Sequence, residues 1–209
     1  MGGRGDVFAF PSGIVLGSAS PSRASLLTSA GLDFRIEKAG VDEAAIRAAL
    51  EGGEGGVPAV DVAEILARAK AEDVSSRNGA ALVIGADQVL ALGDTIFEKP
   101  ENMEAARRTL LALAGETHQL HSAVVLARGG DVIWAHTATA SLTMRELTPE
   151  HVGQYLAAAG DTVLSSVGAY QLEALGINLF EKIDGDYFTI LGLPLLPLLE
   201  RLRQESAAP

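Results

Sequence analysis

The sequence predicts an α/β fold built around a mixed β-sheet, and three observations support this class. The continuous apolar run ALVIG at 81–85 is typical of a strand buried on both faces. The stretch 60–74 places apolar residues at i, i+3, i+4 and i+7, which predicts a helix with one apolar face. The stretch TATASLTM at 137–144 alternates strictly, which indicates a half-buried strand. Strands and helices alternate along the chain, with one antiparallel insertion.

Glycines and capping residues divide the first half of the chain. Gly17 ends a short apolar strand, and Gly31 has a position typical of a helix C-terminus. Asp42 has the side chain of an N-cap residue. The stretch GGEGG at 52–56 predicts a surface loop, because no Lys-Ser or Lys-Thr pair follows it as in phosphate-binding loops. The expected elements are strands at 14–16 and 34–37 and helices at 24–30, 42–51 and 60–74.

Turn and cap residues also divide the second half. Gly93-Asp94 predicts a hairpin after the buried strand, and Gly129-Gly130 joins two antiparallel strands. Asn102 and Thr148 each begin a helix as its N-cap. The segment 167–194 is punctuated by glycine, and no regular element is predicted in it. The expected elements are strands at 81–85, 95–97, 121–127 and 132–144 and helices at 102–113, 148–159 and 195–204.

The composition limits the classes of function. The 209 residues carry a formal net charge of −11, so general binding to nucleic acid, which needs a basic face, is not expected. The most apolar tail segment, LGLPLLPLL, is far shorter than the roughly 20 residues that span a bilayer. The absence of cysteine excludes disulfides and cysteine nucleophiles and suits a cytoplasmic location. We expect a flexible lead-in at 1–12 and a single domain at 13–209.

The stretch LGSASPSRASLL, 16–27, has the pattern of an anion-binding site. A strand, a turn of small polar residues and a helix start present unpaired backbone N–H groups and a helix dipole, which both favour negative charge. Ser18 and Ser20 add hydroxyl donors, and the Arg23 guanidinium can bind two phosphate oxygens. The alternative is that Arg23 is a surface residue in a first helical turn.

A second group of candidate residues surrounds Asp87. Asp87 and Gln88 follow the run 81–85, at the strand end where open α/β sheets bind ligands. A carboxylate there can bind a divalent cation or polarise a water molecule, and a loop cap is the alternative. Lys99 lies across the predicted hairpin, and Lys70 lies beside the apolar stripe of its helix. Both lysines can face the same cleft, and solvated surface positions are their alternative.

Four motifs, in order and with compatible spacing, resemble those of the Maf family of nucleoside triphosphate pyrophosphatases. LGSASPSRASLL resembles the family's S-x-S-P-x-R-x-x-L-L motif, and ALVIGADQV resembles its apolar strand that ends in A/S-D-T/Q. EKPENMEAARRTLLALAGETHQLHSAVVL is similar to its G-K-P…A…L…L-S-G…H…T-G-V segment. VGAYQLEALGINLFEKIDGDYFTILGLPL is similar to its closing A-G-x-Y/F…G…F…I-x-G…V-G-L-P-L segment. The resemblance covers about 14–202, which is nearly the whole chain.

The resemblance implies an architecture and a reaction. Family members have a mixed, twisted sheet with flanking helices and two lobes around a central cleft, and they often form dimers. They hydrolyse noncanonical or pyrimidine nucleoside triphosphates between the α and β phosphates, and they release a nucleoside monophosphate and pyrophosphate. A divalent cation, magnesium or manganese, is needed. The single domain at 13–209 would then be a Maf-like catalytic domain.

The resemblance also implies roles for individual residues. Asp87 would accept a proton from the attacking water. Glu43, in the VDE stretch, matches an acidic position near the family's site, and it joins Asp87 as a candidate metal ligand. The candidate residues for binding the phosphates and stabilising their charge are Ser18, Arg23, Lys70 and Lys99.

Three positions distinguish two branches of the family by the base that they prefer. The dTTP and UTP branch carries R-R after S-P, D-T after the strand, and Gln in Y-x-I-Q-G. The 7-methyl-GTP branch carries S-P-W-R, D-Q, and Glu at that last position. Gln88 and Glu173 match the second branch, and a carboxylate suits the N–H donors of a guanine edge. Ser22 matches neither branch, so a stacking surface for a cationic base is missing there.

A further departure from the family pattern is Glu98, which replaces the usual glycine before Lys-Pro and puts a negative charge beside Lys99. The four histidines have no metal-ligand spacing, and we expect them to be strand or surface residues: His118, His121, His136 and His151. The leading hypothesis is a housecleaning hydrolase, with 7-methyl-GTP as one candidate substrate. Two alternatives stay open: a nucleotide-binding regulator of cell division with little or no catalysis, and a phosphatase that releases orthophosphate.

Overall fold

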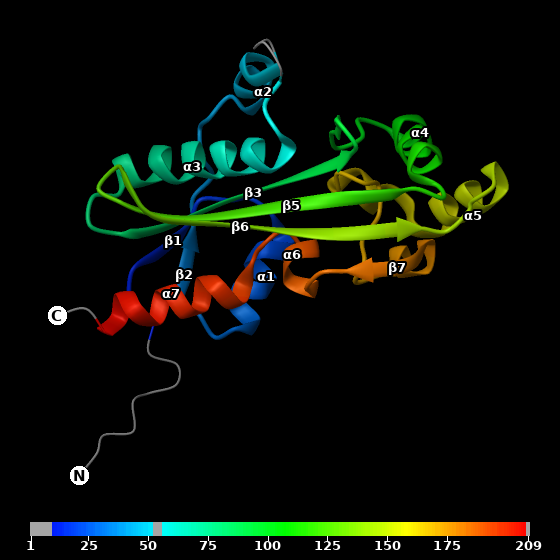
Figure 1. Cartoon of the computed structure of the whole chain (residues 1–209). Coiled ribbons are helices and arrows are strands. Elements are labelled where there is room, and N and C mark those ends of the chain that lie inside the picture. Colours follow the sequence, from blue (N-terminus) through cyan, green and yellow to red (C-terminus); the bar gives the residue numbers. More distant parts are fainter. Residues whose placement is uncertain (1–9, 52–55, 208–209) are drawn as a thin grey trace.

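A seven-stranded mixed sheet organises the molecule (Figure 1). The computed structural model describes residues 10–51 and 56–207. The strand order is β2-β1-β3-β5-β6-β7, and β4 pairs with β3 outside this path. β1 is parallel to β2 and to β3, whereas the other pairs are antiparallel. The predicted α/β class with a mixed sheet is confirmed.

The bounds of the elements are as follows. The strands are β1 (Ile14–Leu16), β2 (Phe34–Ile36), β3 (Leu82–Leu92), β4 (Thr95–Phe97), β5 (Thr117–Arg128), β6 (Asp131–Met144) and β7 (Phe180–Asp184). The helices are α1 (Pro21–Ser29), α2 (Glu43–Glu51), α3 (Ala59–Arg77), α4 (Met103–Leu113), α5 (Pro149–Ala159), α6 (Tyr187–Ile190) and α7 (Leu195–Ala207). Two 3₁₀ helices, η1 (Gly160–Ser165) and η2 (Leu175–Leu179), lie between α5 and β7.

Helices cover both faces of the sheet (Figure 1). On one face Leu66 of α3 shares an apolar cluster with Val125 of β5. On the other face Leu27 of α1 and Leu198 of α7 cluster with Val124. Val124 and Val125 are neighbours in one strand, so their side chains point to opposite faces. α4 and α5 enclose a third cluster with the far ends of β5 and β6.

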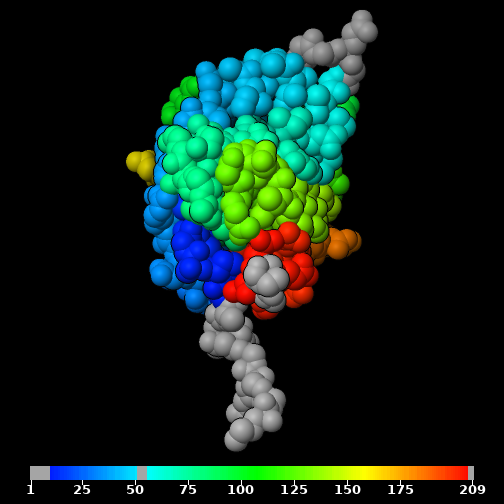
Figure 2. All heavy atoms as spheres, turned by 90° about the vertical axis from the view of Figure 1, so that its left-hand side faces the viewer, coloured from blue at the N-terminus to red at the C-terminus, as the bar shows by residue number. Residues whose placement is uncertain are grey.

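The C-terminal helix lies beside the segment that leads into β1 (Figure 2). Leu198 and Leu202 of α7 share an apolar cluster with Ile14. The guanidinium carbon of Arg203 lies 6.0 Å from the centre of the Phe10 ring. No helix in the described part of the chain is both long enough and apolar enough to cross a membrane.

The short β1 leaves part of the β3 edge without a strand neighbour. β1 pairs with β3 only as far as Leu16↔Ile84, and the Gly17 N–H donates to the Ile84 carbonyl at 2.8 Å. β4 pairs with β3 only from Leu90 onward. Among the described residues, the edge between Ile84 and Leu90 therefore has strand pairing on the β5 side alone. The sheet therefore has a gap between β1 and β4 along this edge of β3.

The predicted position of Asp87 and Gln88 just past a strand end is wrong. Both residues lie in the middle of β3, because antiparallel pairing with β5 continues the strand beyond the apolar run 81–85. The strand that ends beside them is β1. The rule that ligands bind at strand ends in α/β sheets therefore applies through β1 rather than through β3.

Close packing of α3 on β3 depends on Gly85. A Cβ atom at this position would lie 2.5 Å from the Ala67 carbonyl oxygen and 2.6 Å from Ala71 Cβ. Any side chain would therefore force the helix away from the strand. Because Lys70 lies between these two alanines in α3, the glycine also fixes how closely Lys70 approaches the middle of β3.

Most of the other expected elements are confirmed, with shifted ends. α1 begins at Pro21 rather than at 24, because Ser20 caps the helix and proline is favoured in its first turn. β5 begins at Thr117 rather than at 121, since its first residues alternate between exposed and buried positions. Neither β7 nor α6 was predicted, and β7 lies at the edge of the sheet and carries three charged residues in five.

Two expectations fall on residues outside the described ranges. The described ranges omit 52–55, which form most of the predicted GGEGG loop, and 1–9, which form most of the predicted lead-in. The division of the chain into a lead-in and a single domain stays a prediction.

Candidate active site

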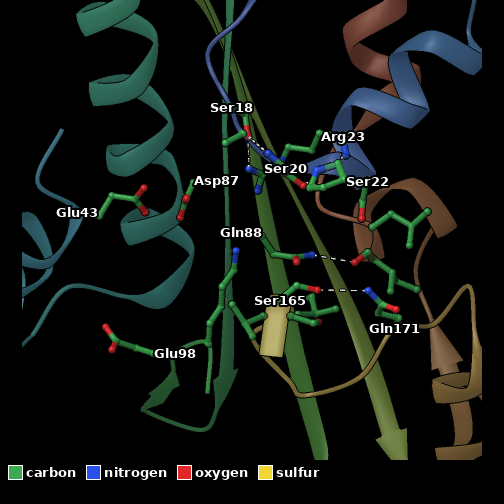
Figure 3. A pocket seen from close by; sticks show the side chains of 18 of the residues that line it. Ser18, Ser20, Ser22, Arg23, Glu43, Asp87, Gln88, Glu98, Ser165 and Gln171 are labelled. Carbon is green, nitrogen blue, oxygen red and sulfur yellow. Dashed lines mark hydrogen bonds between the residues drawn. The ribbon is translucent and has the colours of Figure 1, made fainter. Parts of the chain in front are cut away.

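A cleft of about 650 Å³ opens where β1 ends (Figure 3). Its lining comes from the loop after β1, from the segments after β2 and β4, from α1, α2 and α3, from β3, β4 and β5, from 165–173 and from the end of α6. The site residues predicted from the sequence all line this cleft: Ser18, Ser22, Arg23, Glu43, Lys70, Asp87, Gln88, Lys99 and Glu173. The fold therefore brings them together from distant parts of the chain, while the role of each one stays a prediction.

Arg23 is buried and joins three parts of the chain. Its Nε donates to the Gly192 carbonyl at 2.7 Å, and its Nη1 donates to Ser18 Oγ and to the Ala86 carbonyl, both at 3.0 Å. Ala86 lies on the edge of β3 that β1 leaves unpaired, two residues after Ile84. The guanidinium therefore takes the place of a strand neighbour at this carbonyl. The alternative of Arg23 as a surface residue is wrong.

This bonding limits what Arg23 can offer to a ligand. Three of its five N–H groups donate to protein oxygens, so the two on Nη2 are left for a substrate. Gly192 has φ +92°, and a Cβ atom there would lie 3.4 Å from Nη2. Burial lowers the pKa of Arg23, and the carboxylates of Asp87 and Glu43 oppose this change.

Asp87 and Lys70 form a buried ion pair in the cleft. Lys70 Nζ lies 2.6 Å from Asp87 Oδ1, and only 10% and 6% of the two side chains are exposed. The same ammonium lies 3.0 Å from Glu43 Oε1, so it joins carboxylates from two different elements. Loss of one member of a buried pair leaves the other charge uncompensated, which typically costs about 3–5 kcal/mol.

These two carboxylates suit a small divalent cation. Mg²⁺ is usually bound by one or two carboxylates together with substrate phosphates. Asp87 and Glu43 both reach the same Lys70 atom, so their oxygens converge. Within 10–51 and 56–207 no group of three or more His, Cys, Asp or Glu residues could hold a metal. The two carboxylates therefore fit an ion that also takes ligands from a substrate.

Arg47 is a cleft residue that was not predicted from the sequence. It follows Glu43 by four residues in α2, and its Nη2 lies 3.5 Å from Asp87 Oδ2. The i, i+4 spacing puts Arg47 on the same helix face as Glu43, and this signal could have found it. Lys38 lines the cleft as well, and no pattern in the sequence singles it out.

Lys99 and Glu98 line the cleft from the segment after β4. Desolvation lowers the pKa of Lys99, and the positive charges of Arg23 and Lys70 lower it further. The Lys99 ammonium is therefore a cation that a bound anion would stabilise. The negative charge that Glu98 brings lies within the cleft lining too, beside this lysine.

Gln88 stabilises a wall of the cleft through its amide nitrogen. The two N–H groups of Nε2 share three acceptors: Ser122 Oγ at 3.0 Å and the carbonyls of Thr189 and Ile190 at 3.1 and 2.9 Å. Ser122 Oγ itself donates to the Thr189 carbonyl at 2.7 Å. This nitrogen is thus occupied by the protein, and Gln88 shapes the cleft by holding the C-terminal part of α6.

Segment 165–173 forms the end of the cleft that lies away from α2. In Figure 3, Glu43 and Gln171 lie on opposite sides of Asp87. Glu173 and Tyr170 contribute to this end, and Glu173 is exposed. Its lining also includes Leu172 and Val167, so this end combines apolar surface with a carboxylate. Such a mixture suits a nucleobase better than a phosphate chain.

A hydrogen bond to His118 holds Tyr170 in place. His118 Nε2 and the Tyr170 hydroxyl are 2.7 Å apart, and both side chains are buried. The residue before Tyr170, Ala169, has φ +58°, a conformation that residues other than glycine rarely adopt. Burial lowers the pKa of His118 to about 4 and raises the pKa of Tyr170, so the pair is uncharged near neutral pH.

The other histidines are strand or surface residues, as predicted. His121 in β5 shares a hydrogen bond of 2.8 Å with Thr139, and His136 lies in β6. His151 is exposed and forms the capping box of α5 with Thr148. None of these three residues lines the cleft.

Comparison with known proteins shows which family and which relatives the chain is similar to. A family model described as Maf-like protein matches residues 13–205. The chain is 58% identical over 193 residues to a 7-methyl-GTP pyrophosphatase of Brucella abortus. The aligned residues make up 92% of this chain and 96% of the relative. It is 57% identical over 194 residues to a protein of the same name from Mesorhizobium japonicum, with 93% and 96% covered. A nucleoside triphosphate pyrophosphatase of Bradyrhizobium diazoefficiens is 48% identical over 193 residues, with 92% and 94% covered.

Burial of His118 predicts a pH-dependent stability. The pKa of His118 is about 4 in the folded protein against 6.5 as the ordinary value, so the unfolded chain binds more protons between these values. The free energy of unfolding should fall by up to about 3 kcal/mol as the pH falls from 6.5 to 4. Urea unfolding of His118→Gln across this range should show a smaller loss than the wild type.

Tyr170→Phe is the matched control, because it keeps the buried imidazole and removes only its hydrogen-bond partner. It should retain the wild-type dependence on pH, with lower stability throughout. An unchanged pH dependence in His118→Gln would contradict the assignment of the effect to this residue.

Proposed function

Because this chain belongs to the Maf-like protein family, we propose that it is a nucleoside triphosphate pyrophosphatase whose preferred substrate is 7-methyl-GTP. The observation that carries the proposal is the cleft itself, in which the buried Asp87–Lys70 pair lies among four further cations, two from helices and two from loop segments. The relatives that bear these enzyme names align with more than nine tenths of the chain.

The proposed reaction breaks the anhydride bond between the α and β phosphates. A water oxygen attacks the α phosphorus, the bond from that phosphorus to the bridging oxygen breaks, and pyrophosphate leaves with the electron pair. Asp87 accepts the proton that the water loses, which is general base catalysis. Its burial beside Lys70 holds the carboxylate in one position for this purpose.

The phosphates are bound by residues of α1, α3 and the segment after β4. Lys70 and Lys99 supply ammonium groups, and Arg23 supplies its Nη2. Ser18 adds a hydroxyl at the turn before α1. Asp87 and Glu43 would hold a magnesium or manganese ion. When bound, such an ion neutralises charge that develops on the phosphate oxygens.

The preference for 7-methyl-GTP rests on the far end of the cleft. The exposed Glu173 carboxylate can accept hydrogen bonds from a guanine edge, and its charge favours a methylated, cationic ring. Ser22 supplies no stacking surface, but Phe97 and Tyr170 are aromatic residues of the same lining. Gln88 contributes to the base preference indirectly, because its amide holds Ile190, which lines the cleft, in position.

Two further expectations from the resemblance belong to this proposal. We expect a homodimer and a cytoplasmic location, since family members often form dimers and the chain has no cysteine. Light scattering during size-exclusion chromatography measures the first directly. Neither expectation affects the proposed chemistry.

A nucleotide panel tests the activity. With Mg²⁺ or Mn²⁺ present, we expect pyrophosphate rather than orthophosphate from 7-methyl-GTP, at a higher kcat/KM than from GTP, UTP, dTTP or 5-methyl-UTP. Asp87→Asn should lower kcat about 100-fold or more, because general base catalysis typically contributes that much. Asp94→Asn, in the turn after β3, is the matched control and should keep the wild-type rate.

Orthophosphate as the product would instead indicate a phosphatase. Binding without turnover of any nucleotide would support a nucleotide-binding regulator. Full turnover by folded Asp87→Asn would contradict the role of this carboxylate.

The base preference is tested at Glu173. Glu173→Gln replaces the carboxylate with an amide, which suits a uracil or thymine edge because it offers a donor and an acceptor together. We expect the ratio of kcat/KM for 7-methyl-GTP over UTP to fall about tenfold or more. Glu181→Gln on β7, outside the cleft lining, is the matched control. An unchanged ratio in Glu173→Gln would remove Glu173 from the base site.

A further inference from the structure

Both carboxylate oxygens of Asp87 face cations of the protein. Oδ1 lies 2.6 Å from Lys70 Nζ, and Oδ2 lies 3.5 Å from Arg47 Nη2. Lys70 comes from α3 and Arg47 comes from α2, so the two cations approach from different helices. The carboxylate that the proposed reaction uses as its base therefore has a cation beside each of its oxygens.

The two contacts differ in strength. The Lys70 contact is a short, buried ion pair, whereas the Arg47 contact is at the outer limit for a hydrogen bond. Arg47 is also less enclosed, with 17% of its side chain exposed against 10% for Lys70. Arg47 can thus exchange its partner at lower cost than Lys70 can.

Arg47 has donors to spare. Among the described residues, Asp87 is its only hydrogen-bond partner, and the contact uses one of five N–H groups. Arg23, by contrast, has committed three of its five to protein oxygens. A planar guanidinium with free donors binds phosphate oxygens in pairs. Arg47, not Arg23, is the arginine of this cleft that can present a full fork to a phosphate.

The position of α2 indicates which phosphates Arg47 would meet. In Figure 3, Glu43 of α2 and Gln171 of the base end lie on opposite sides of Asp87. A nucleotide with its base near segment 165–173 and its α phosphate at Asp87 would extend its β and γ phosphates toward α2. The apolar residues Ile46 and Leu50 of α2 pack against the buried cluster formed by α3, β3 and β5, so the polar face of α2 is held at the cleft.

The cleft has nearly as many carboxylates as cations, so the loss of a single cation changes its net charge appreciably. The lining contains five cationic side chains, Arg23, Lys38, Arg47, Lys70 and Lys99, and four carboxylates, Glu43, Asp87, Glu98 and Glu173. Its net formal charge is therefore only +1. A nucleoside triphosphate carries several negative charges, so removal of one cation near the phosphates should weaken binding substantially.

We propose that Arg47 binds the departing pyrophosphate group, and that in the nucleotide-free protein the same guanidinium rests against Asp87. Binding of a triphosphate moves Arg47 from Oδ2 to the β and γ phosphates. One oxygen of Asp87 is then released to face the attacking water. This inference rests on the proposed function for the identity of the leaving group, but its binding part requires no turnover.

The test compares Arg47→Gln with the wild type in two measurements. Calorimetric titration with inorganic pyrophosphate in the presence of Mg²⁺ should give a dissociation constant about 10- to 100-fold higher for the variant. Titration with 7-methyl-GMP should give the same constant within about twofold. In steady-state kinetics with 7-methyl-GTP, kcat/KM should fall by a factor similar to that for pyrophosphate. Arg47→Lys, which keeps the charge without the fork, should recover part of both losses.

Arg68→Gln is the matched control. Arg68 lies on α3, pairs with Glu64 and does not line the cleft, so its loss should change neither measurement. Equal affinity of Arg47→Gln and wild type for pyrophosphate would overturn the proposal. An equal loss for pyrophosphate and for 7-methyl-GMP would overturn it too, since that result means general damage to the cleft.

The two proposals fail separately. A wild type that hydrolyses no nucleotide but binds pyrophosphate through Arg47 would refute the proposed function and support this inference. A wild type that hydrolyses 7-methyl-GTP, with Arg47→Gln unaffected in both measurements, would refute this inference alone.

Discussion

The burial of one guanidinium group constrains the rest of the site. β1 ends at Leu16, and the next carbonyls of the β3 edge need a partner other than a strand. Arg23 supplies it at Ala86, one residue before Asp87, and it binds Gly192 and Ser18 at the same time. A strand neighbour there would have filled the cleft. An arginine side chain satisfies the Ala86 carbonyl and leaves the adjacent Asp87 open to a ligand.

The same arrangement explains how a protein of net charge −11 can bind a polyanion. Two cations of the cleft face carboxylates: Lys70 faces both Asp87 and Glu43, and Arg47 faces Asp87. These pairs keep several positive charges in a small volume without strong mutual repulsion. A triphosphate can then replace the carboxylates as the partner of some cations, and the cost of desolvating those cations has already been met during folding.

The sequence predicted the α/β class, most of the helices and most of the functional residues that meet in the cleft, although not Arg47 or Lys38. That success depends on local signals, such as apolar runs, caps and motifs of a few residues. The structural role of Arg23 could not be predicted, because its bond to Gly192 joins residues 169 positions apart. The same holds for the bonds of Gln88 to Thr189 and Ile190. The position of Asp87 within β3 was missed because strand pairing, not the apolar run, determines where β3 ends.

The stability of Arg23→Lys tests the central claim most directly, because it separates a structural arginine from a phosphate ligand. A lysine keeps the positive charge but cannot reach the Gly192, Ala86 and Ser18 oxygens together. Each buried carbonyl that loses its donor costs about 1–3 kcal/mol. We therefore predict that urea unfolding in the absence of nucleotide shows a loss of at least about 2 kcal/mol. A variant as stable as the wild type, with nucleotide affinity alone reduced, would contradict the account.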